Sequence, residues 1–322
     1  MTISRAFALL LLAATPAWAD DAPPAFKTEL EGAHPLTGRI WQPASGRFLS
    51  PGDLMAEAGR ADAVLLGETH DNPDHHALQA WVVERLTVAG PRPAVAFEMI
   101  DADQRPALEA YLTAHPGDAA GLGAAVEWNR RGWPDWTLYR PIAAAVLKAG
   151  GPVRPASLPR DLTRKISRAE EPVELAARLG LDQPLATEDA AAMAEDIRAS
   201  HCNMLPESAV AGMVRTQRAR DAEMASVLAG LLAAGHRPAV LIAGAGHVRA
   251  DRAVPPRLAA LVPGARVLAL AFVEVQPGED DPAAYGQAFG APRLPFSAVW
   301  FTPRSARADQ CAEFAKHMKA KK

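Results

Sequence analysis

The sequence predicts an α/β fold with a mostly parallel central sheet, helices on both of its faces and a helical insertion or cap. Compact apolar runs recur along the chain, and each is followed by a turn and an amphipathic helical pattern. The runs are continuously apolar rather than alternating, which is typical of parallel strands that are buried on both faces. A long middle stretch, about residues 161–234, shows helical patterns and no strand.

The expected strands are 63–66, 93–97, 237–243, 267–272 and 296–301. A helix should follow the first strand over residues 72–89, because Asn72 is a good N-cap residue and Pro73 suits the first helical position. A second helix is expected over residues 103–114, and further helices over 188–200 and 208–233 within the insertion. The Pro- and Gly-rich segments 152–159 and 277–282 are interpreted as loops.

The N-terminus has the order of features found in a secretory signal peptide. Arg5 precedes an apolar run over residues 6–14, and Ala17-Trp18-Ala19 is a small-x-small cleavage site. The run is shorter than the roughly 18 residues that a membrane span requires. We therefore expect a signal peptide at 1–19, no transmembrane segment, and a single domain over 20–322 that is located in the periplasm. The first cysteine is Cys202, so no lipid-anchor cysteine lies near the cleavage site.

The net charge of the chain argues against nucleic acid as a binding partner. The whole chain has a net charge of −3, which becomes −4 without Arg5, and 49% of its residues are hydrophobic. A basic surface is needed for non-specific nucleic-acid binding, so no nucleic-acid partner is expected. The two cysteines, Cys202 and Cys311, would form a disulfide in an oxidising compartment if the fold brings them close enough, which sequence alone does not determine.

Polar residues that could bind a ligand or take part in catalysis lie at the ends of three expected strands. Glu68 and His70 follow the first strand, Glu98 ends the second, and His247 follows the third in the segment Gly244-Ala245-Gly246-His247. The carboxyl ends of parallel strands meet at one edge of a sheet, where ligands bind. Alone, each residue is more often a cap or an internal hydrogen-bonding group. Together they suit a divalent metal or general acid–base catalysis. His75 and His76 are supporting candidates.

An aromatic segment follows at residues 128–139. It holds three of the seven tryptophans and one of the three tyrosines, and arginines are interspersed among them. Aromatic residues are more often core than cofactor-binding. The glycine and proline residues that interrupt this segment favour the wall of a cleft.

Several of these segments resemble the ChaN-like haem-binding uptake family, within a superfamily that includes Tiki, TraB and erythromycin esterase-like proteins. The similar segments are 64–76, Gly132-Trp133-Pro134-Asp135-Trp136, His201-Cys202 with Leu205-Pro206, 217–221 and 244–249. They occur in order and cover about residues 60–260. The resemblance implies an envelope location, haem binding across a homodimer, and a role in iron uptake with an unidentified delivery partner.

The resemblance leaves two functions open. The first is a periplasmic haem-binding protein, with Tyr139 as the iron ligand, Trp133, Trp136 and Arg130 around the cofactor, and His201 or the strand-end histidines as competing ligands. The alternative is a metal-dependent hydrolase of the Tiki or erythromycin esterase type. In that case Glu68, His70, Glu98 and His247 would bind the metal and carry out catalysis.

Overall fold

The computed structural model describes residues 22–88 and 92–320. The expected signal peptide, residues 1–19, lies outside these ranges. Within them, no helix is both long enough and apolar enough to cross a membrane.

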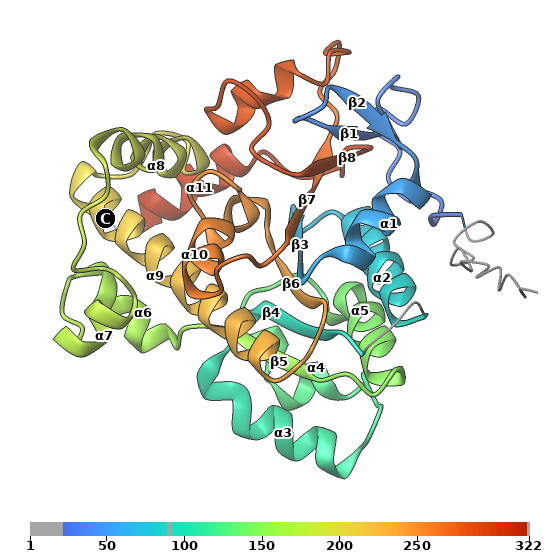
Figure 1. Ribbon diagram of the computed structural model, residues 1–322. Helices are drawn as coiled ribbons and strands as arrows, with labels where there is room; N and C mark the ends of the chain where they lie inside the picture. The colour runs from blue at the N-terminus through green and yellow to red at the C-terminus, as the bar shows by residue number, and fades with distance from the viewer. Residues whose placement is uncertain (1–21, 89–91, 321–322) are drawn as a thin grey trace, which may run out of the picture.

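Eight strands form one sheet in the order β2-β1-β8-β7-β3-β6-β4-β5 (Figure 1). Six neighbouring strands are parallel to one another, and the β1-β2 pair adds an antiparallel edge beside β8. The strands are β1 (Ile40–Gln42), β2 (Arg47–Leu49), β3 (Ala63–Glu68), β4 (Ala94–Asp101), β5 (Val153–Ser157), β6 (Ala239–Gly244), β7 (Val267–Glu274) and β8 (Ala298–Thr302).

Helices cover both faces of this sheet, as Figure 1 shows. Val64 and Leu66 of β3 pack on one side, against α1 (Pro51–Arg60), α2 (Pro73–Val88) and α5 (Trp136–Lys148). Ala63 and Leu65 pack on the other side, against α9 (Glu207–Ala233) and α10 (Val254–Leu261). Successive side chains of a strand point to opposite faces, so the consecutive residues Ala63–Leu66 of β3 are all apolar. This confirms the predicted α/β class.

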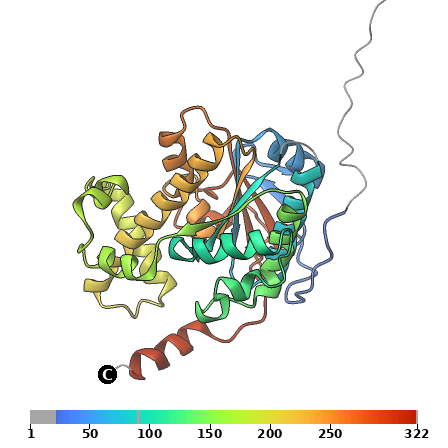
Figure 2. The same ribbon diagram turned by 90° about the horizontal axis from the view of Figure 1, so that it is seen from below.

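The middle of the chain is helical, as predicted. It contains α6 (Arg160–Ser167), α7 (Val173–Arg178), α8 (Thr187–Ser200) and the long α9. Figure 2 shows α6, α7 and α8 grouped beside the sheet, at a distance from α1 and α2. The remaining helices are η1 (Ala102–Gln104), α3 (Arg105–Ala114), α4 (Leu122–Ala125), η2 (Trp128–Arg130), η3 (Ala245–Val248), η4 (Ala284–Phe289) and α11 (Gln310–Ala320).

The interpretation of residues 152–159 as a loop was wrong. Val153–Ser157 forms β5, an edge strand that pairs in parallel with β4. Pro155 cannot donate a ladder hydrogen bond, and proline is tolerated at a sheet edge for that reason. Strands β1 and β2 were also not predicted, because each has only three residues.

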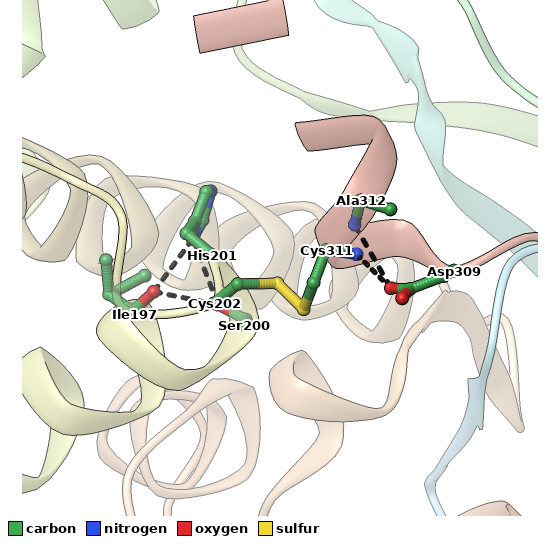
Figure 3. The surroundings of a disulfide bond; sticks show 7 residues. All are labelled: Ile197, Ser200, His201, Cys202, Asp309, Cys311 and Ala312. Carbon is green, nitrogen blue, oxygen red and sulfur yellow. Dashed lines mark hydrogen bonds between the residues drawn. A yellow bond between two sulfur atoms is a disulfide. The ribbon is translucent and has the colours of Figure 1, made fainter. Parts of the chain in front are cut away.

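A disulfide joins Cys202, just after α8, to Cys311 at the start of α11 (Figure 3). The two Cα atoms are 5.6 Å apart, within the range that a disulfide requires. Next to it, the rings of His201 and Phe314 have centroids 5.7 Å apart. The C-terminal helix is therefore joined to the helical cap at the connection between α8 and α9.

Candidate functional site

The four strand-end residues lie at the carboxyl ends of three neighbouring strands. Glu68 is the last residue of β3, and His247 lies in η3 directly after β6. Glu98 was expected to end the second strand, but β4 continues for three more residues, to Asp101. Strand β6 is hydrogen-bonded to both β3 and β4, so it lies between them. We call Glu68, His70, Glu98 and His247 the strand-end cluster.

Glu68 is the centre of the first half of this cluster. Its Oε1 lies 2.7 Å from Nδ1 of His70 and accepts a hydrogen bond of 2.7 Å from the Tyr139 hydroxyl. Its Oε2 lies 3.0 Å from Nδ1 of His76. Burial alone would raise the pKa of Glu68, but His76 and His70 hold the pKa well below its usual value. Glu68 is therefore a fixed, buried negative charge.

Glu98 is the centre of the second half. Its Oε2 accepts a hydrogen bond of 2.8 Å from the Gly244 N–H, and its Oε1 accepts one of 2.9 Å from Arg220. His247 lies between two carboxylates: its Nε2 is 3.3 Å from Glu98 and its Nδ1 is 2.6 Å from Asp221. Burial alone would lower the pKa of His247, but these two acids raise it to about 9. His247 is therefore an imidazolium at neutral pH.

The two halves meet at Gly244. A Cβ atom built on this residue would lie 3.1 Å from Nε2 of His70 and 3.7 Å from Oε2 of Glu98. A side chain at this position would crowd the space between the two pairs. Gly67 has a related role, because a Cβ there would lie 2.3 Å from a methyl group of Val248. Both glycines thus allow a close approach between chain segments.

His70 is the accessible member of the cluster. Its side chain is 34% exposed, whereas that of Glu68 is fully buried. Burial alone would lower the pKa of His70, but its contact with Glu68 raises it. When Nδ1–H donates to Glu68, the lone pair of Nε2 is left free for a ligand. Within residues 22–88 and 92–320, Nε2 has no hydrogen-bond partner.

The arrangement does not favour the divalent-metal interpretation. Both ring nitrogens of His247 face carboxylates, so neither presents a free lone pair. Among the described residues, no group of three or more His, Cys, Asp and Glu side chains is arranged to hold a metal ion. The metal-dependent hydrolase, which needs several converging ligands, therefore loses its structural support.

Two cavities flank α9 near the cluster. The first, about 370 Å³, is lined by Trp133, Asp101 and three arginines, Arg160, Arg164 and Arg220. We call it the arginine cavity. The Trp133 ring lies 5.0 Å from the His70 ring, centroid to centroid, so one residue of the cavity lining also contacts His70. The second cavity, about 400 Å³, lies between α8, α9 and η4 and is lined by Gln217 and Asp221, among others.

The residues that were expected to bind the cofactor are in different environments: some are in the core, one is on the surface and one lines the arginine cavity. Tyr139 is fully buried, and its hydroxyl is committed to Glu68, so its assignment as the iron ligand is corrected. Trp136 is also in the core, where its Nε1–H donates to the Ala119 carbonyl. Arg130 is on the surface, paired with Glu127, and does not line the arginine cavity. Of the aromatic segment, Trp133 alone lines that cavity.

His201 lies in the helical cap, whereas His75 and His76 lie in α2, close to His70. His201 follows α8, and its Nδ1 lies 2.8 Å from the Ile197 carbonyl oxygen, next to the disulfide (Figure 3). His76 contacts Glu68, as described above. The Nδ1 of His75 accepts a hydrogen bond of 2.9 Å from the Thr69 N–H, and burial lowers its pKa to about 3. His75 therefore fixes the loop that carries His70.

Three site residues on α9 were given no role from the sequence. Asp221 and Gln217 contact Nδ1 of His247, and Arg220 binds Glu98. The available signal was the spacing of Gln217 and Asp221, which are four residues apart and so share one helix face. The buried carboxylate of Asp221 indicates a partner, since acids are almost never fully buried unpaired.

Comparison with known proteins agrees with this fold. A family model described as haem-binding uptake, Tiki superfamily, ChaN matches residues 54–258. The solved structure of ChaN from Campylobacter jejuni, described with cofacial haem binding, superposes with a TM-score of 0.63 and 19% identity. The match covers 81% of this chain and 95% of that chain. The chain therefore belongs to the haem-binding uptake family of the Tiki superfamily.

Two further solved structures match with lower scores. An erythromycin esterase, EreC, in its open conformation gives a TM-score of 0.46 with 12% identity, covering 84% of this chain and 99% of that chain. The type III effector HopBA1 gives 0.45 with 15% identity, covering 79% and 93%. No curated protein sequence matches the chain.

Proposed function

We propose that this protein binds haem at the open side of the strand-end cluster, with Nε2 of His70 as the iron ligand, and serves haem or iron uptake. The observation that carries the proposal is the pairing of a partly exposed imidazole with the buried carboxylate of Glu68. Histidines that bind metals commonly donate their other N–H to a carboxylate, which fixes the tautomer and orients the ring.

The residues around His70 fit such a cofactor. Haem iron accepts an imidazole as an axial ligand, and bound haem supplies the chemistry of its iron. Trp133, 5.0 Å from the His70 ring, offers a flat apolar surface on which a porphyrin would pack. Glu68 holds the proton of Nδ1, and Tyr139 and His76 hold Glu68 in place.

Haemin titration followed by the Soret band tests this assignment. We expect saturable binding to the wild-type protein, and a shifted Soret band with weaker binding for His70→Gln. His201→Gln is the matched control, because it removes the competing imidazole beside the disulfide and should leave the spectrum unchanged. If His201→Gln changed the spectrum and His70→Gln did not, the iron ligand would be His201 in the helical cap and not His70.

A periplasmic location and a homodimer complete the proposal. The disulfide between Cys202 and Cys311 is typical of an oxidising compartment and supports export through residues 1–19. Mass spectrometry of the periplasmic protein should give an N-terminus at Asp20. ChaN from Campylobacter jejuni binds haem cofacially, so we expect haemin to convert this chain to a dimer in sedimentation experiments. A monomer saturated with haemin would contradict the dimer.

A further inference from the structure

The arginine cavity has an excess of positive charge. Its lining contains Arg160, Arg164 and Arg220 but only one acid, Asp101. That acid is itself 2.6 Å from Arg131, a fourth arginine outside the lining. The cavity on the other side of α9 is balanced, with two arginines and two aspartates. Of the two cavities beside the strand-end cluster, this one is suited to a negatively charged group.

Arg164 and Arg220 retain donors for such a group, whereas Arg160 donates through Nη2 to the Arg131 carbonyl and its Nε lies 3.9 Å from Asp101. Arg164 pairs with Asp161, but their side chains are 70% and 83% exposed, and surface pairs of this kind hold their partners weakly. Arg220 donates to Glu98 through Nη2, while its Nε is buried and has no hydrogen-bond partner in the described part of the chain. A buried donor of this kind gains free energy when an acceptor reaches it.

Two residues of the cavity lining also contact the strand-end cluster. Trp133 lines the cavity, and its ring also contacts that of His70. Arg220 forms the second connection, because it lines the cavity and binds Glu98 of the strand-end cluster. A flat ligand that lies on Trp133 with its centre at His70 would therefore extend an edge toward the arginines.

We infer that the arginine cavity binds the carboxylates of the tetrapyrrole. The protein would then select a porphyrin with ionised carboxylates over its neutral ester. The inference rests on the proposed function and adds the ligand's ionic form and the residues that recognise it. Arg160 and Arg164 of α6 and Arg220 of α9 are the donors. Charge-assisted hydrogen bonds from arginine to carboxylate are the strong, geometrically specific kind that such selection needs.

The test compares three ligands, namely haemin, haemin dimethyl ester and iron-free protoporphyrin IX. The variants are Arg164→Gln, the double variant Arg160→Gln/Arg164→Gln, and His70→Gln. Lys165→Gln is the control, since it removes one positive charge from the same helix at an exposed residue outside the cavity lining. Dissociation constants come from Soret titration, or from fluorescence for the iron-free ligand.

We expect wild-type protein to prefer haemin over its dimethyl ester by about ten-fold. The double arginine variant should lose about ten-fold in haemin affinity with an unshifted Soret band, and bind the ester as the wild type does. Lys165→Gln should match the wild type. In His70→Gln, protoporphyrin IX affinity should be retained.

Each other outcome has a definite meaning. Equal wild-type affinity for haemin and its ester, with no effect of the arginine variants, would overturn the inference and leave haem binding intact. Selective protoporphyrin IX binding with no haemin Soret change would support the carboxylate site and reject iron ligation by His70. Absence of binding by any of the three ligands would overturn both.

Discussion

Nδ1 of His70 lies 2.7 Å from Oε1 of Glu68, and the two residues come from the same strand end, two positions apart. Glu68 is buried and held by Tyr139 and His76, whereas the His70 ring reaches the surface. The pair thus joins a rigid anion in the core to an accessible imidazole. This geometry lets His70 present a free Nε2 without a change in the fold.

Replacing Tyr139 with phenylalanine should affect stability rather than the haem spectrum. The substitution removes a buried hydrogen bond to Glu68, so we expect unfolding to require about 1–2 kcal/mol less free energy. Because the hydroxyl faces the core, the Soret maximum of the haemin-loaded variant should equal that of the wild type. Tyr285→Phe is the matched control, because it removes another buried hydroxyl, whose hydrogen bonds are to the backbone of Gln276 and Glu279. A Soret shift confined to Tyr139→Phe would restore tyrosine as the ligand.

Gly67→Ala should destabilise the protein by about 1–3 kcal/mol, the usual effect of overpacking. The new Cβ would lie 2.3 Å from a Val248 methyl group and 3.0 Å from the Ala245 Cα, and the backbone atom has little freedom to move. Gly246→Ala is the matched control, because the nearest atom to its Cβ is 4.0 Å away, on Gln217. Urea unfolding of both variants measures the difference. Equal stability of the two would show that η3 adjusts freely against β3.

Stability should fall at alkaline pH because of His247. The pKa of His247 is about 9 in the folded protein, against 6.5 for a histidine side chain in water, so the folded state holds the proton more tightly. The resulting stabilisation is complete below pH 6.5 and is lost as the pH rises through 9, amounting to about 3 kcal/mol at most. Urea unfolding at pH 6, 7.5 and 9.5 checks this. His247→Gln should remove most of the decline, and an equal decline in that variant would assign it to other groups.

Reducing the disulfide should release α11 without unfolding the sheet. Cys311 is the second residue of this helix, and the other contact described above is between Phe314 and His201. A disulfide that closes a loop of 109 residues could contribute about 4–5 kcal/mol to the free energy of unfolding if the helix stayed docked. Because the helix is released locally, the loss of stability on reduction should be smaller. In Cys202→Ser/Cys311→Ser, trypsin should cleave near Lys316 faster than in the oxidised wild type, with little change in thermal midpoint. Identical cleavage rates would show that the helix docks without the disulfide.

The sequence predicted those parts of the molecule in which local pattern and tertiary environment agree. Continuous apolar runs located five of the six parallel strands, and Glu68, Glu98 and His247 were placed at one sheet edge by topology alone. Strand β5 was missed because Pro155 and Arg154 do not resemble a buried strand. Being at the edge, β5 forms its ladder on one side only, so its residues need not be those of a central strand.

The aromatic segment was misread for a different reason. A sequence gives the spacing of Trp133, Trp136 and Tyr139, but not the direction of each side chain. Asp135 caps α5 at the point where the segment enters that helix, so Trp136 and Tyr139 turn into the core. Trp133, which precedes the helix, remains in the loop and lines the arginine cavity. Direction is set by where the helix begins, a boundary that sequence patterns locate only to within a few residues.

A crystal structure of the chain loaded with haemin tests the central claim most directly. The account predicts iron bonded to Nε2 of His70, the Nδ1 hydrogen bond to Glu68 retained, and the porphyrin lying against Trp133. Iron bonded to any other side chain, or a porphyrin seated away from the carboxyl ends of β3, β4 and β6, would contradict it.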